Sequence, residues 1–288
     1  MLQTSRSRQR DKTKGFGGPT PSTKTGPGPR LKVAKIGIVS RDYRHKYKNG
    51  FRDFSEKFSG ILKLLDNKGC DTVLFSLYSI DFSKRKSFRP FGSLRLRHVK
   101  AVLYEEGGRG QKNRQCVVFY RRASKWHRYV LPGGGFPTLK GLSDKKKREK
   151  VGRFVERSIP GRTLGNCCAI LCGEINRVPY HMDTGRVGDD FGQRESLQKE
   201  VTVILNPGHD RMTRFEMKLK RCFLSKNDRW VISVWNKGRQ DKNRRTHDGT
   251  KPPWSVFHNG REETKKVDER LRNKIEKVEI GILEIRGA

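Results

Sequence analysis

The chain has 288 residues, enough for one large α/β domain or two small ones, and it carries a formal charge of +35 from 65 Lys and Arg against 30 Asp and Glu. A balance this basic attracts polyanions such as nucleic acid or an acidic membrane surface, and it says nothing about fold. The sequence shows no apolar run near the roughly 18 residues that span a bilayer and no apolar segment of a secretory signal, so a cytoplasmic protein without membrane contact is expected.

The cysteines argue against a disulfide framework. Six are present and none forms a C-x-x-C pair, while several lie inside apolar strand-like runs. Cys167, Cys168 and Cys172 could supply soft metal ligands, but no His stands at a suitable local offset from them. The pattern predicts reduced, mostly buried thiols, with no metal site and no cofactor.

The first 30 residues differ from the rest of the chain in composition. Residues 1–30 hold seven basic residues and one acidic residue among Gly, Pro, Ser and Thr. Such a composition cannot bury enough apolar surface to offset the entropy lost on ordering. It predicts a disordered basic tail followed by a single domain over residues 31–288.

The front of this domain has a strand–helix–strand pattern. Residues 33–39 form a β-branched apolar run, and Phe and Leu residues at three- to four-residue spacing over 51–65 predict a helix that Gly69 stops. Residues 71–77 form a second apolar run. This βαβ unit favours a sheet with helical cover.

The middle of the chain is more polar. Residues 99–104 and 115–120 are predicted strands joined by a Gly- and Arg-rich turn, and residues 129–131 are a further short strand. Residues 143–157 form a basic helical or flexible stretch.

The pattern becomes more regular from residue 165 onward. A strand is predicted over 168–172, a helix around 189–199, and a buried strand over 201–205. A helical stripe over 212–223 begins with the capping-box pattern Thr213-x-x-Glu216. Three further strands are predicted over residues 230–235, 255–258 and 279–285.

Cys172 is the strongest candidate for a reactive side chain. It ends an apolar strand and is followed at once by Gly-Glu, and strand ends in α/β sheets present side chains to the crevice where ligands bind. A thiol beside a carboxylate and near backbone amides can act as a covalent nucleophile when its pKa is lowered. The alternative, a cysteine buried in the core, is favoured by the local sequence alone.

A polar loop and several basic clusters each allow a functional and a purely structural interpretation. The loop around His209 and Asp210, with Arg214 one turn on, could bind substrate or tune the thiol, or it could be a polar loop in which Asp210 caps the next helix. Basic clusters over 84–100, 143–157 and 237–245 could bind nucleic acid non-specifically, or they could form a solvated surface.

The order of these motifs resembles the nitrilase, or carbon–nitrogen hydrolase, superfamily. Residues 170–174 (ILCGE) take the place of that family's strand-end quartet with its nucleophilic Cys. Residues 231–238 are similar to its strand ending in Asn and Gly, and residues 254–260 (WSVFHNG) to its late hairpin. The resemblance spans most of 33–286 and is closer from residue 165 onward.

The chain departs from the family's Glu–Lys–Cys triad. Residues 75–77 (FSL) stand where the family has a Phe-Pro-Glu-like motif, and Arg128 stands where it has the Lys. Glu105 or Glu106, and Glu174, could replace the missing base. Cys172, Glu106 and Glu174 form the predicted catalytic set.

The resemblance implies an α/β, nitrilase-like four-layer αββα sandwich that forms a homo-oligomer. It also implies cysteine-dependent hydrolysis of a small-molecule amide or nitrile through a thioester intermediate. The basic charge of the chain adds that a positive rim around Cys172 would suit an anionic substrate. Arg128, His209, Asp210 and Arg214 are the predicted substrate-binding residues. The alternatives are an inactive protein that keeps this fold and a basic nucleic-acid-binding protein.

Overall fold

The computed structural model describes the following residues: 28–41, 56–77, 79–80, 91, 94–106, 115–132, 142–209, 214–237, 251–272 and 274–285.

Two six-stranded sheets form the centre of the molecule. The first has the order β14-β1-β2-β3-β4-β5. Its strands are β1 (Lys35–Arg41), β2 (Thr72–Phe75), β3 (Ala101–Glu106), β4 (Gln115–Arg122), β5 (Lys125–Val130) and β14 (Val278–Glu284). Strands β1, β2 and β3 are parallel, β14 and β4 pair antiparallel to β1 and β3, and β5 pairs antiparallel to β4.

The second sheet repeats this plan, with the order β13-β12-β11-β10-β7-β6. Its strands are β6 (Thr163–Leu164), β7 (Cys167–Ala169), β10 (Val203–Pro207), β11 (Trp230–Val234), β12 (Trp254–His258) and β13 (Arg261–Glu262). Here β7, β10 and β11 are the parallel strands. Ligand sites in α/β sheets lie at the carboxyl ends of parallel strands, so a site is expected where these strands end.

Helices cover the outer faces of both sheets. They are α1 (Phe58–Asn67), α2 (Asp144–Arg157), α3 (Ile159–Arg162) and α4 (Phe215–Leu224), with the short 3₁₀ helices η1 (Cys172–Arg177) and η2 (Thr264–Lys266). A small hairpin pairs β8 (Tyr180–His181) with β9 (Arg186–Val187).

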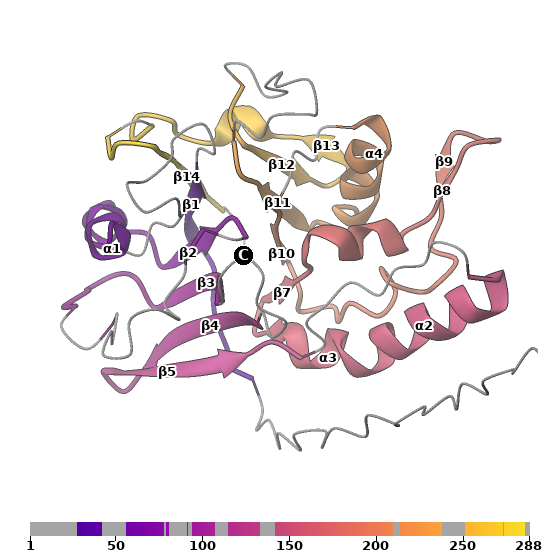
Figure 1. The fold of residues 1–288 in the computed structure, drawn as a ribbon, viewed down its shortest axis with the longest axis horizontal. Coiled ribbons are helices and arrows are strands. Elements are labelled where there is room, and N and C mark those ends of the chain that lie inside the picture. The colour runs from indigo at the N-terminus through magenta and orange to yellow at the C-terminus, as the bar shows by residue number, and fades with distance from the viewer. Residues whose placement is uncertain are drawn as a thin grey trace, which may run out of the picture.

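Three apolar clusters define four layers. One lies between the sheets and joins residues such as Ile38 and Leu74 to Leu205 and Ile232. The second packs α1 on the outer face of the first sheet, and the third packs α2 and α4 on the outer face of the second. Figure 1 shows this order, with α1 on one side and α2 and α4 on the other. The predicted αββα sandwich is confirmed.

Close packing of α1 depends on a glycine. Phe58, Ile61, Leu62 and Leu65 are fully buried on one face of this helix, as its three- to four-residue apolar spacing predicts. A Cβ on Gly37 in β1 would stand 2.6 Å from a methyl carbon of Leu65. Only glycine therefore allows the helix to approach the sheet at this distance.

Polar contacts join the two sheets at the carboxyl ends of their parallel strands. The Ser40 hydroxyl donates to the Trp235 carbonyl oxygen at 2.6 Å, and the Leu77 amide donates to the Gly208 carbonyl oxygen at 3.0 Å. A buried ion pair, Lys237 with Glu279 at 2.5 Å, connects the segment after β11 to β14.

Several sequence predictions need correction or lie outside the described residues. Residues 189–199 form turns rather than a helix, because Gly192 has a left-handed φ of 66° and the Asp189 carboxylate accepts from two following amides. The strand predicted at 129–131 is the end of the longer β5. Thr213 lies outside the described residues, and Arg214 occupies the N-cap of α4 without a side-chain cap.

Residues just before the predicted start of the domain already pack against it. Pro29 is already buried and Leu31 donates to the Leu164 carbonyl oxygen at 3.2 Å, while residues 1–27 of the predicted tail lie outside the described residues. In the described part of the chain, no helix is both long enough and apolar enough to cross a bilayer.

Candidate active site

Cys172 lies at a strand-to-helix turn. After β7 the Ile170 amide still donates to the Leu205 carbonyl oxygen at 2.9 Å, and the chain then turns into η1, of which Cys172 is the first residue. The half-buried Cys172 side chain packs against both the cluster between the sheets and the cluster beneath α4. The thiol thus lies where the second sheet meets the crevice between the sheets.

The environment of Cys172 keeps the thiol protonated. Burial raises its pKa above the ordinary value, while a main-chain hydrogen bond from His209 and the positive charge of Arg221 lower it. The upward effect of burial is the larger one. A thiol held in this form needs a proton acceptor before it can attack as a thiolate.

A buried charge cluster holds the turn beneath Cys172. The Glu174 carboxylate is 1% exposed, pairs with the Arg162 guanidinium and accepts from the Leu171 amide at 2.8 Å. Burial raises the pKa of Glu174, and Arg162 opposes the rise. One oxygen of this carboxylate holds the turn through Arg162 and the Leu171 amide, while Oε1 is buried without a hydrogen-bond partner among the described residues.

The chain segment before Cys172 is also fixed from a neighbouring strand. The side-chain amide of Asn206 donates to the Ile170 carbonyl oxygen at 2.5 Å, and the Ser233 hydroxyl donates to the Asn206 side-chain oxygen at 2.8 Å. All three residues are buried. These bonds fix the segment before Cys172 from three adjacent strands, β7, β10 and β11.

His209 and Glu105 bring an imidazole and a carboxylate close to Cys172. Glu105 lies opposite Cys116 in the register of β3 and β4, and Cys116 belongs to the cluster between the sheets, so Glu105 faces inward. Its carboxylate lies 3.4 Å from Nε2 of His209. The main chain of His209 bonds to the Cys172 thiol, so the residue whose imidazole lies beside Glu105 also contacts Cys172.

Asn236, which follows β11 of the second sheet, bonds both to His209 and to residues that follow β2 of the first sheet. Its side-chain amide donates to the carbonyl oxygens of Leu77 at 2.7 Å and His209 at 3.0 Å, and its side-chain oxygen accepts from the Ser76 hydroxyl at 2.8 Å. Ser76 follows β2 and Asn236 follows β11, which lie in different sheets. The site is therefore built from the strand ends of both sheets.

Two arginines from α4 and its cap add positive charge near the thiol. Arg221 is 1% exposed, donates to the Ser255 hydroxyl, and has its Nε and Nη2 buried without a hydrogen-bond partner in the described part of the chain. Burial lowers the pKa of Arg221 to about 10, so it remains charged at neutral pH. Arg214 is exposed and pairs with Glu216 at 3.1 Å, and its charge also lowers the pKa of Cys172.

The remaining predicted residues lie elsewhere or outside the described residues. Arg128 is exposed on the outer face of the first sheet, because Tyr129 and Leu131 of the same segment face the inner cluster. It bonds to Gln115 at 3.0 Å and does not face the crevice. The Glu106 side chain and the whole of Asp210 lie outside the described residues.

Most of the other cysteines are buried, as predicted. All six cysteines are free, and burial raises the pKa of Cys70 and Cys168 to about 12. Only Cys172 and Cys222 are half-buried. Within the described ranges, no group of three His, Cys, Asp or Glu side chains is arranged to hold a metal ion.

Among known proteins, this chain is similar only to solved structures, at low sequence identity. No family model matches the sequence, and no curated protein matches it. A glutamine-dependent NAD(+) synthetase from Cytophaga hutchinsonii is 10% identical with a TM-score of 0.44, and the match covers 88% of this chain and 43% of the synthetase. This chain thus spans less than half of the synthetase's length.

A second similar structure is a mutant of the Nesterenkonia AN1 amidase from the nitrilase superfamily. It is 13% identical with a TM-score of 0.46, and the match covers 91% of this chain and 94% of the amidase. Identities this low concern the fold and not the activity.

Proposed function

We propose that this chain is a thiol-dependent hydrolase that cleaves the carbon–nitrogen bond of a small amide, with Cys172 as nucleophile. The observation that carries the proposal is that His209 bonds to the Cys172 thiol through its main chain and places its imidazole beside Glu105, where the two sheets meet. A nucleophile beside a base that a third group orients is the usual composition of a covalent catalytic site. Glu105 thereby takes the role of the base, for which the sequence offered Glu105, Glu106 and Glu174.

The proposed reaction has two steps. The Cys172 sulfur attacks the amide carbon while its proton passes to the His209–Glu105 pair. The carbon–nitrogen bond then breaks, the leaving amine takes that proton, and an acyl thioester remains on sulfur. A water molecule gives a proton to the same pair and attacks the thioester, which releases the carboxylic acid and restores the thiol.

Nearby donors and cations suit the charge that develops. The main-chain amide of His209 bonds to the thiol and remains in place for a thiolate. Arg221 and Arg214 give the surroundings of Cys172 a positive potential, which favours an amide substrate that carries a carboxylate. The free thiols support a reducing compartment, and we place the protein in the cytoplasm.

The test combines trapping with turnover. Purified protein is mixed with a panel of small carboxylated and neutral amides, ammonia release is measured, and intact mass is recorded for an acyl adduct. Cys172→Ala should abolish both signals, whereas Cys222→Ala, which removes the other half-buried thiol, should leave them unchanged. Glu105→Gln should reduce turnover by about 10²–10⁴-fold, the usual contribution of a general base.

An unreactive Cys172 would count against the proposal. If wild type releases no ammonia from any amide and forms no adduct, the fold is present without the activity. Equal loss in Cys172→Ala and Cys222→Ala would point to a structural effect of removing a thiol.

A further inference from the structure

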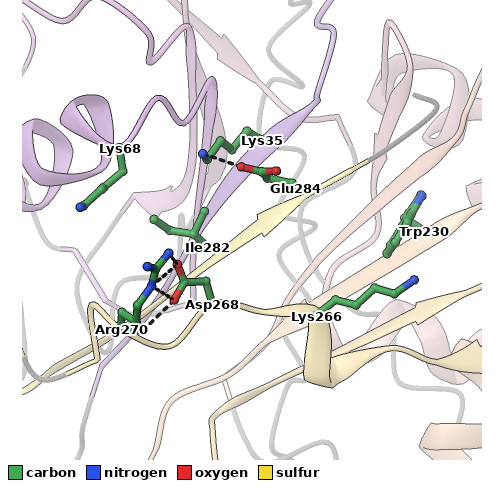
Figure 2. A pocket seen from close by; sticks show the side chains of 8 residues that line it. All are labelled: Lys35, Lys68, Trp230, Lys266, Asp268, Arg270, Ile282 and Glu284. Carbon is green, nitrogen blue, oxygen red and sulfur yellow. Dashed lines mark hydrogen bonds and ion pairs between the residues drawn. The ribbon is translucent and has the colours of Figure 1, made fainter.

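A cavity of about 550 Å³ lies at the opposite end of the strands from Cys172. Lys35 begins β1 and Trp230 begins β11, and the carboxyl ends of these two strands carry the Cys172 site. The lining residues, drawn in Figure 2, are Lys35, Lys68, Trp230, Lys266, Asp268, Arg270, Ile282 and Glu284. The cavity is therefore separate from the crevice of the proposed hydrolase.

The lining has twice as many cationic side chains as carboxylates, and both carboxylates are already paired. Glu284 accepts from Lys35 at 2.7 Å, as Figure 2 shows. Asp268 accepts from the Arg270 guanidinium at 2.6 Å and from its main-chain amide at 3.0 Å. Arg270 lowers the pKa of Asp268 to about 2, so this carboxylate stays ionised and occupied by its partner.

Two lysines remain for a ligand. Lys68 is exposed at the C-cap of α1, and its ammonium forms no ion pair within the described ranges. Lys266 is exposed, lies 5.5 Å from the centre of the Trp230 ring, and has only a surface pair with Glu263 at 3.3 Å. Exposed pairs of this kind contribute little energy, so the Lys266 ammonium can exchange Glu263 for an anion.

We infer that this basic cavity binds phosphate groups, supplied by a nucleic-acid strand or by a free nucleotide. Lysine ammonium groups bind phosphate as compact point charges, and the volume falls within the range of small-ligand pockets. The chain has a formal charge of +35, so other Lys and Arg side chains can attract the rest of a nucleic-acid strand when some of its phosphates bind in the cavity. This favours a nucleic-acid strand as the source.

The test compares charge reversals at matched sites. One variant combines Lys68→Glu with Lys266→Glu, and the control combines Lys145→Glu with Lys146→Glu, two exposed lysines of α2. Both variants change the net charge equally, so they share any loss of general attraction. Binding of a fluorescent single-stranded oligonucleotide is measured by anisotropy between 50 and 200 mM salt, about the range over which phosphate contacts are resolved. ATP and inorganic tripolyphosphate are titrated as competitors.

The cavity variant should bind the oligonucleotide about tenfold more weakly than the control, with a salt slope smaller by about 1.4, as expected for two lost phosphate contacts on a single strand. If ATP or tripolyphosphate displaces the oligonucleotide from wild type but not from the cavity variant, free phosphate compounds also bind in the cavity. Equal weakening in both variants, or no measurable binding by wild type of any of the three probes, would overturn the inference. Amide hydrolysis is expected to be unchanged in the cavity variant.

Discussion

The ion pair between Lys237 and Glu279 gives a sharp test of how the two sheets are held together. Lys237 follows β11 of the second sheet and Glu279 lies in β14 of the first, with side chains 6% and 5% exposed. Glu279 also accepts from Arg272. Glu279→Gln keeps the shape of the side chain and removes its charge, which leaves the Lys237 ammonium buried without a counter-ion. Loss of one partner of a buried pair costs about 3–5 kcal/mol.

The same strand supplies a matched control. Glu284 pairs with Lys35 at 2.7 Å, but its side chain is 62% exposed. Glu284→Gln should therefore reduce the free energy of unfolding by about 0.2–1 kcal/mol, the range for surface pairs. Urea unfolding followed by circular dichroism measures both variants, and the midpoint of Glu279→Gln should fall by about 1 M or more. A cost below about 1 kcal/mol for Glu279→Gln, similar to that of the control, would refute the view that this pair is desolvated.

Three further predictions follow from the described contacts. Burial raises the pKa of Cys172, so iodoacetamide should label this thiol slowly at neutral pH, and the labelling rate should still rise above about pH 8.5. Peptide mapping measures this rate, and rapid labelling of Cys172 below neutral pH would contradict the prediction. Gly37→Ala should destabilise the fold by about 1–3 kcal/mol in urea unfolding, because the new methyl group meets Leu65. Asn236→Ala should lower the rate of hydrolysis more than it raises KM, because the carbonyl oxygen of His209 loses its donor; an unchanged rate would remove Asn236 from the site.

Apolar patterning made most of the fold predictable. Strands such as 71–77 and 201–205 are buried on both faces and therefore have continuous apolar sequences, which are easily recognised. The error over 189–199 arose because a polar segment was assigned as a helix without an apolar stripe. Its turns depend on Asp189 and Gly192, which are signals of turns rather than of helices.

Site residues could be predicted where their position along the chain was sufficient, but not where the prediction required knowing which face of a strand points inward. Cys172 could be identified because it comes just after an apolar strand. The choice between Glu105 and Glu106 depends on the register of β3 against β4, which the polar turn between them does not specify. Arg128 could have been excluded by alternation, since its neighbour Tyr129 faces inward.

The last strand of the chain completes the first sheet. β14 pairs along the whole length of β1, so Lys35 lies beside Glu284 and Arg41 beside Val278. During synthesis on the ribosome, one edge of β1 therefore stays unpaired until β14, which lies much later in the sequence, has been made. An unpaired apolar edge of this kind invites association with other chains. Loss of the last strand by proteolysis or early termination would expose the same edge.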